Sequence, residues 1–207
     1  MTIHHARTGE ATSRRLLPDT AAAITTVLVN TEAIAHRYGW DQQPVLFGLF
    51  DHVTSSGEAA VEVDATIAEP EVWTVPDPHR HGAHLPPPVV LHRLARDLTS
   101  PAASRWLGDW LHQRGRTCVG IGLVFEAWAG PRRPGYRYGD LANAPAGQRR
   151  EIRVVAAVDT DLGLHRIIRV RGTDTPRVDR RAHLPARGRH RSVLTGLYRL
   201  VRLARSH

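Results

Sequence analysis

The sequence TCVGIGLVFEAWAG, residues 117–130, is the longest apolar run in the chain and decides the fold class. Its residues alternate between the two faces of a predicted strand. One face carries Val119, Ile121, Leu123, Phe125 and Ala127, and the other carries Cys118, Gly120, Gly122, Val124, Glu126 and Trp128. Because both faces are mostly apolar, we expect a central strand covered on both sides, with Phe125 and Trp128 largely buried on opposite faces.

Glu126 is the only charged residue in this run. A buried carboxylate without a partner is unfavourable, so Glu126 requires a cation close by. Arg153 and Arg169, on the strands predicted to follow, are the expected partners across the sheet.

The remaining patterns place helices and other strands around the central run. They predict helices over about 18–38, 89–98 and 101–115, and strands over 44–51, 61–67, 152–159 and 164–171. The proline-rich segment 68–88 predicts an extended linker. Strands 117–130, 152–159 and 164–171 follow one another closely and therefore predict a meander. The fold class is α+β: an antiparallel sheet with a three-strand meander, covered by helices, plus a basic C-terminal helix.

Charge is distributed unevenly along the 207 residues. The net charge is +8, and the sequence contains no lysine. Residues 177–207 hold nine arginines and one acidic residue, Asp179, which gives +8 for this segment and zero for residues 1–176. We therefore predict a disordered N-terminus (1–14), an α+β globular domain (15–176), and an Arg-rich tail with an amphipathic helix (177–207). Removing the tail is expected to leave the globular domain folded.

Composition excludes several classes of protein. A single cysteine rules out an internal disulfide framework, and the absence of lysine rules out a Schiff-base, phosphate-loop or pyridoxal phosphate lysine. The chain has no nucleophile-elbow motif, no dinucleotide fingerprint and no apolar stretch of bilayer-spanning length. We expect a cytoplasmic protein that has no cofactor and is not an enzyme.

Three segments carry a resemblance: GLVFEAWAG at 122–130, the hairpin REIRVVAAVDTDLG at 150–163, and HRIIRVRGTD at 165–174. With these segments, roughly residues 15–176 resemble a family of proteins from actinobacteria, their plasmids and their phages. The resemblance implies a mobile-element or phage setting. It brings no established activity and no catalytic residues.

Two groups of residues are candidates for catalysis or metal binding. Carboxylates with a histidine can hold a divalent metal for phosphodiester hydrolysis, and the candidates are Glu126, Asp159, Asp161 and His165. The alternative is structural, because aspartates in a hairpin turn commonly bond their own backbone. A second group has metal-binding composition and consists of Asp77, His79, His81 and His84. Its spacing matches no closed zinc set, so we favour a solvated loop and expect no bound metal.

The candidates for nucleic-acid binding are arginines and tyrosines in two segments. The Arg/Tyr loop between two strands offers rings for base stacking and guanidinium groups for phosphates: Arg132, Arg133, Tyr136, Arg137 and Tyr138. The tail adds Arg180, Arg181, Arg187, Arg189, Arg191, Arg199 and Arg202. Arg177 and Arg205 belong to the same clusters.

The sequence therefore predicts an accessory protein that binds nucleic acid or a nucleoprotein partner through its tail and its Arg/Tyr loop. Two alternatives stay open. The first is a protein–protein adaptor or inhibitor whose basic helix docks on a partner, and the second is a metal-dependent hydrolase. It is also open whether the tail helix docks its apolar face on its own sheet.

Overall fold

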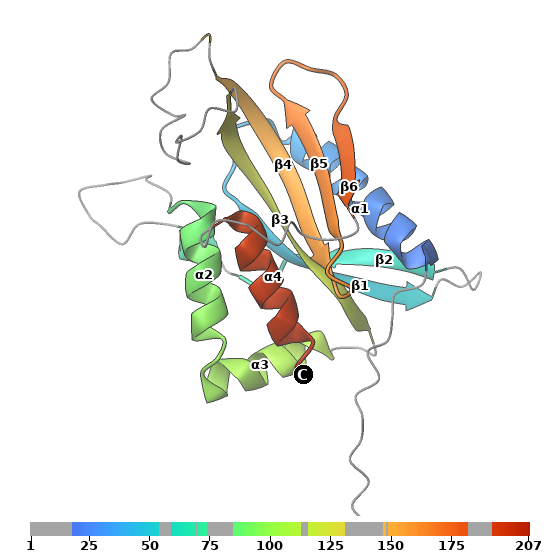
Figure 1. Cartoon of the computed structure of the whole chain (residues 1–207), viewed down its shortest axis with the longest axis vertical. Coiled ribbons are helices and arrows are strands. Elements are labelled where there is room, and N and C mark those ends of the chain that lie inside the picture. The colour runs from blue at the N-terminus through green and yellow to red at the C-terminus, as the bar shows by residue number, and fades with distance from the viewer. Residues whose placement is uncertain are drawn as a thin grey trace, which may run out of the picture.

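The computed structural model describes residues 18–53, 59–68, 70–73, 85–112, 116–130, 147, 149–181 and 192–207, so the N-terminus predicted to be disordered lies outside it. Its centre is one antiparallel sheet in the order β2-β1-β3-β4-β5-β6 (Figure 1). The strands are β1 (Val45–Val53), β2 (Ala59–Asp64), β3 (Thr117–Ala129), β4 (Arg150–Asp159), β5 (Leu164–Val170) and β6 (Arg177–Arg181). The predicted meander is present as β3-β4-β5 and continues into β6.

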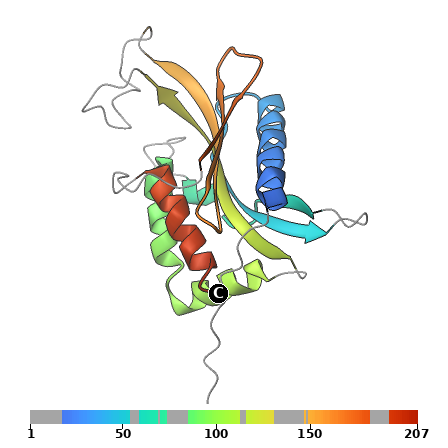
Figure 2. The ribbon, with the colours of Figure 1, turned by 45° about the vertical axis from the view of Figure 1, so that its right-hand side comes forward.

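Helices cover both faces of the sheet, as Figure 2 shows. One face carries α1 (Pro18–Arg37), and the other carries α2 (Pro87–Asp97), α3 (Pro101–Leu111) and α4 (Val193–Ala204). The predicted class, α+β with helices over an antiparallel sheet, is confirmed. Among the described residues, no helix is both long and apolar enough to cross a membrane.

Each face of the sheet has its own apolar core. Under α1, Ile24 and Leu28 pack against Phe47, Val155 and Ile167, and all five side chains are 0 % exposed. The larger core on the opposite face joins strands β1, β3 and β4 to the other helices. Burying one such side chain contributes about 1.5–3 kcal/mol, so the two cores together hold the helices on the sheet.

The alternation predicted for the central run holds from residue 120 onward and reverses before it. Leu49 of β1 pairs with Gly120, but the next residue, Phe50, pairs with Cys118. Val119 is therefore the extra residue of a β-bulge, which shifts the strand's facing by one position. As a result Val119 packs in the core under α1, whereas Ile121 packs in the core on the other face.

Two predictions, the burial of Trp128 and the linker over 68–88, are wrong in part. Phe125 is buried as expected, but Trp128 is only half-buried because β3 runs past the helices that cover its middle. The segment 68–88 is not purely a linker either. It contains a 3-10 turn, η1 (Pro70–Trp73), which places Trp73 in the core at 1 % exposure, and α2 already begins at Pro87.

The segment predicted to be a tail contributes two elements to the body of the protein. Arg177–Arg181 form β6, which pairs with β5. α4 docks its apolar face on the sheet, where Leu197, Leu200 and Val201 are at most 1 % exposed. Ser192 caps the helix by accepting a hydrogen bond from the Thr195 backbone N–H at 3.1 Å.

The contact between α2 and α4 depends on a glycine. A Cβ atom on Gly196 of α4 would lie 2.5 Å from Cβ of Leu91 on α2, which is too close for two carbon atoms. Helix propensity alone counts this glycine as a weakness of about 1 kcal/mol. In the folded protein its missing side chain is what lets the two helices approach.

We predict that Gly196→Ala lowers the free energy of unfolding by about 1–3 kcal/mol, because overpacking outweighs the gain in helix propensity. Gly108→Ala in α3 is the matched control, since a Cβ atom there meets only the His207 ring, at 3.4 Å. That variant should be neutral or stabilised by up to about 1 kcal/mol. Urea unfolding followed by circular dichroism measures both. Equal stabilisation of the two variants would contradict a close α2–α4 contact.

Candidate nucleic-acid interface

Six exposed arginines of the C-terminal segment lie on β6 and α4. We call this set the basic surface: Arg177, Arg180, Arg181, Arg199, Arg202 and Arg205. On β6, Arg177 pairs with Ile168, which contacts the core beneath α4, so Arg177 and Arg181 face the α4 side of the sheet. Val178 pairs with Ile167 of the core under α1, so Val178 and Arg180 face the α1 side.

The one acidic residue among these arginines is neutralised by a different strand. Asp179 accepts a short hydrogen bond from Arg166 of β5, and Arg181 lies 3.5 Å away. The hydrogen bond from Arg166 holds the pKa of Asp179 below its ordinary value, so the carboxylate stays ionised at neutral pH. With Arg166 counted, this corner of the sheet carries four arginines against one aspartate.

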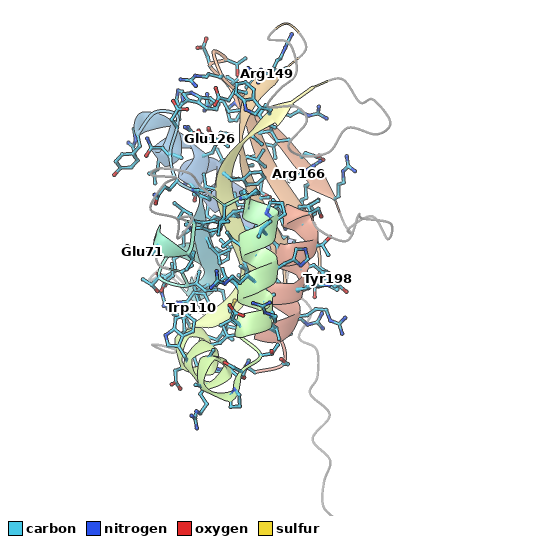
Figure 3. The ribbon with its side chains drawn as sticks, turned by 90° about the vertical axis from the view of Figure 1, so that its left-hand side faces the viewer. Glu71, Trp110, Glu126, Arg149, Arg166 and Tyr198 are labelled. Atoms are coloured by element: carbon cyan, nitrogen blue, oxygen red, sulfur yellow. The ribbon has the colours of Figure 1, made fainter. Side chains whose placement is uncertain are left out.

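The arginines of α4 point away from its docked face. Nη1 of Arg199 lies 2.9 Å from Nδ1 of His92 on α2, and Arg202 lies over the Tyr198 ring at 5.9 Å. Figure 3 shows Tyr198 on the same side of the sheet as Arg166. The side chains of α4 and the α4-facing arginines of β6 therefore give one side of the protein a positive charge.

The other predicted nucleic-acid residues fall outside the described part of the chain. They are Arg132, Arg133, Tyr136, Arg137 and Tyr138 in the Arg/Tyr loop, and Arg187, Arg189 and Arg191 between β6 and α4. The Arg/Tyr loop connects β3 to β4. At this end of the sheet Arg149 lies over the Trp128 ring at 4.4 Å, and Figure 3 shows Arg149 there.

The four catalytic candidates do not converge. Asp159 and His165 are in contact, and Asp161 lies in the β4–β5 turn. Glu126 pairs with Arg153, six residues along β4 from Asp159, so it lies toward the opposite end of the strand. The candidate metal tract of Asp77, His79, His81 and His84 lies outside the described residues.

His165 is held on both ring nitrogens. Nε2 lies 2.9 Å from Oδ2 of Asp159, and Nδ1 lies 3.3 Å from the Thr25 hydroxyl on α1. A hydroxyl, an imidazole and a carboxylate in line are the components of a catalytic triad. Here, however, the Thr25 hydroxyl also donates to the Ala21 carbonyl of its own helix turn at 3.2 Å. His165 is 2 % exposed, so this line joins α1 to the sheet rather than presenting a nucleophile.

Asp159 also forms the hydrogen bond to its own turn that was predicted as the structural alternative to metal binding. Its Oδ1 accepts a hydrogen bond from the Gly163 backbone N–H at 2.7 Å, across the β4–β5 turn. A carboxylate that closes its own turn is common in hairpins.

Two further ion pairs lie under α1. Arg169 of β5 donates to both carboxylate oxygens of Glu32 on α1, at 2.7 and 2.6 Å, and Glu32 is 0 % exposed. These bonds raise the pKa of Arg169 above its ordinary value. Arg153 pairs with Glu126 at 2.8 Å, as the sequence predicts, and also donates to the Gly39 carbonyl just beyond α1.

We call the buried and half-buried polar groups under α1 the polar seam: Thr25, His165, Asp159, Glu32, Arg169, Arg153 and Glu126. The seam continues to the residues just beyond α1, where the guanidinium groups of Arg153 and Arg171 lie 4.5 and 5.4 Å from the centre of the Trp40 ring. Sequence analysis missed the Glu32–Arg169 pair. Its only signal was a glutamate on the apolar side of a helix pattern.

Three carboxylates near Trp40 lie close enough to hold a metal ion: Asp41, Glu126 and Glu151 have ligand atoms within 4.8 Å of one another. Two arginines already bind all three carboxylates. Arg153 pairs with Glu126, and Arg171 pairs with Glu151 at 2.6 Å and with Asp41 at 3.4 Å. The hydrogen bond to Glu151 also raises the pKa of Arg171. The cluster is therefore a set of ion pairs in which two arginines offset two of the three negative charges, so it has a structural explanation without a metal.

Cys118 is unsuited to nucleophilic chemistry. Burial raises the pKa of its thiol to about 12, so the reactive thiolate is scarce at neutral pH.

No protein-family model matches this chain, and no curated protein or solved structure is detectably similar to it.

We predict that Arg169→Met destabilises the protein by about 3–5 kcal/mol, because it leaves the Glu32 carboxylate buried without its partner. Glu32→Met combined with Arg169→Met removes both charges and should restore most of that loss. Arg93→Met, on an exposed ion pair of α2, is the control and should change stability much less. Urea unfolding measures all three. Wild-type stability of the single variant would show that the pair does not anchor α1.

Proposed function

We propose that the protein binds nucleic acid, or a nucleoprotein partner, through the basic surface, as an accessory protein in a phage or mobile-element setting. One observation carries the proposal: six arginines of residues 177–207 are exposed on ordered elements, and the only acidic residue of that segment is bound by Arg166. The arginines inside the protein, in contrast, are matched by carboxylates. Among the described residues of this segment, positive charge therefore exceeds negative charge on the exposed surface of β6 and α4.

Guanidinium groups suit this role because their planar fork matches a phosphate and stays charged at every physiological pH. On α4, Arg199, Arg202 and Arg205 follow one side of the helix. A rise of about 1.5 Å per residue separates the first and last by about 9 Å along the axis, which is about the length of three nucleotides in one DNA strand. Phosphate contacts of this kind position a protein on the DNA backbone without recognising the base sequence.

The Arg/Tyr loop is a second part of the proposal. Its tyrosines, Tyr136 and Tyr138, offer rings for the bases of a single strand, each stacked base contributing about 1–3 kcal/mol. Arg149 and Trp128 at the foot of this loop add a cation and a ring.

The alternatives are less well supported. An adaptor that docks a free amphipathic helix on a partner does not fit, because the apolar face of α4 already packs on its own sheet. A metal-dependent hydrolase built on the predicted residues requires them to converge, and Glu126 lies apart from Asp159 and His165. The carboxylates that do lie close to Glu126, Asp41 and Glu151, are bound by arginines.

Removing residues 177–207 is not a usable test, because β6 and α4 belong to the body of the protein. Substitutions that remove charge from exposed side chains are a usable test. We predict that wild-type affinity for duplex DNA falls by about two to three powers of ten between 50 and 200 mM salt, if about four to six phosphates are contacted. Arg199→Gln, Arg202→Gln and Arg205→Gln together should reduce the slope of log K against log salt by up to about 2.7. Fluorescence anisotropy at several salt concentrations measures this slope.

The control for this experiment is Arg93→Gln with Arg96→Gln on α2, two exposed arginines that lie within 3.5 Å of Asp97. This control variant removes two positive charges, compared with three in the α4 variant, but should leave the slope of log K against log salt unchanged. Circular dichroism checks that every variant is folded. Equal slopes for wild type and the α4 variant would reject the basic surface as the nucleic-acid site, and a protein partner captured after nuclease treatment would then favour the adaptor.

A further inference from the structure

We propose that the outer edge of β6 accepts an extended acidic segment of a partner protein as an additional antiparallel strand. β6 is the last strand in the sheet order, and within the described residues no strand pairs with its outer side. An edge strand presents backbone N–H and C=O groups that a further strand can pair with. This inference goes beyond nucleic-acid binding, because it depends on the backbone of β6 as well as on its charge.

The two edges of the sheet differ in charge. At the β2 edge, Arg116 donates to both Glu62 and Asp64, so these three groups carry a net charge of −1. Burial alone would raise the pKa of Asp64, but hydrogen bonds from Thr66 and Arg116 outweigh it and lower the pKa. At the β6 edge, Arg177, Arg180 and Arg181 are exposed, and Asp179 is held from within the sheet by Arg166. The β6 edge therefore favours an acidic strand.

Charge also argues against a second copy of this chain as the occupant in the register that pairs all five residues of β6. Antiparallel pairing of two β6 strands about Asp179 would place Arg177 opposite Arg181 and Asp179 opposite Asp179. Like charges directly opposite each other destabilise a strand pair. A partner with carboxylates at the arginine positions turns the same contacts into attractions.

The depression beside β6 determines at which position the partner segment should carry an apolar side chain. A depression of about 450 Å³ lies between α1 and β6, lined by Ala22, Thr25, Thr26 and Val29 of the helix and by Val178 and Arg180 of the strand. Val178 is 49 % exposed at its margin. A residue paired with Val178 would project to the α1 side of the sheet, so an apolar side chain there would cover both Val178 and the depression.

The pairing register with β6 then determines which type of residue the partner segment needs at each position. Read from its N-terminus, an antiparallel strand meets Arg181, Arg180, Asp179, Val178 and Arg177 in turn. The complementary order is acidic, acidic, small polar, apolar, acidic, and the peptide EESVE between flexible ends represents it. The peptide EEVSE has the same composition and charge but turns its valine to the α4 side. Since the two peptides differ only in the order of Ser and Val, the comparison separates strand pairing from general charge attraction.

The test is fluorescence anisotropy of both labelled peptides with the full-length protein at 50 mM salt. We expect EESVE to bind at least about tenfold more tightly than EEVSE, and backbone N-methylation of EESVE to weaken binding by a similar factor. Arg180→Gln should weaken the binding of EESVE and of DNA. Val178→Ser, an exposed change, should weaken EESVE and leave DNA affinity unchanged.

Equal affinity for EESVE and EEVSE, or an N-methylated peptide that binds as well as its parent, would overturn the inference, because binding would then rest on charge alone. Slower hydrogen exchange of residues 177–181 on addition of EESVE would support it, and unchanged exchange would contradict it. The peptide-binding and hydrogen-exchange measurements use no DNA, so failure of the nucleic-acid proposal and failure of this one are distinguishable. If both hold, DNA and the peptide should compete for Arg177, Arg180 and Arg181.

Discussion

The buried ion pair between Glu32 and Arg169 fixes the position of α1, and much of the rest of the structure depends on it. Apolar contacts alone would let a helix slide or rotate on a sheet, because they have little directional preference. A bidentate guanidinium–carboxylate pair has a single good geometry. With α1 in this place, Thr25 reaches His165 and the Gly39 carbonyl reaches Arg153. The polar seam thus determines where α1 sits on the sheet, while the apolar cores provide the buried apolar surface that stabilises the contact.

Two contrasting groups of arginines occur among the described residues of this lysine-free protein. Those on the sheet under α1, Arg153 and Arg169, are buried and bind carboxylates and backbone carbonyls. Those on β6 and α4 are exposed. The same side chain can serve both roles because its charge does not depend on pH and its long apolar stem packs well. Net charge alone therefore says little about a protein of this composition, whereas the placement of each arginine says much.

The fold was largely predictable, and the site only in part. Strong apolar periodicity located the central strand, the meander and the helices, and the Glu126–Arg153 pair followed from the cost of burying a charge. The bulge at Val119 left no trace in the apolar pattern, since valine suits either face. The placement of Trp73 and Glu32 depends on contacts between residues far apart in the chain. The tail was misjudged because composition reports charge, whereas the docking of α4 depends on its apolar side.

The packing of α4 has a consequence for how the protein is made. Leu197, Leu200 and Val201 close a core whose other walls are β3 and β4, yet α4 follows every strand in the chain. During synthesis at about 5–20 residues per second, the segment from Arg177 onward takes roughly 2–6 seconds to appear. Over that interval the α4-facing side of the sheet has no cover from this helix. Aggregation during translation, rather than instability of the finished fold, is then the hazard that this chain order creates.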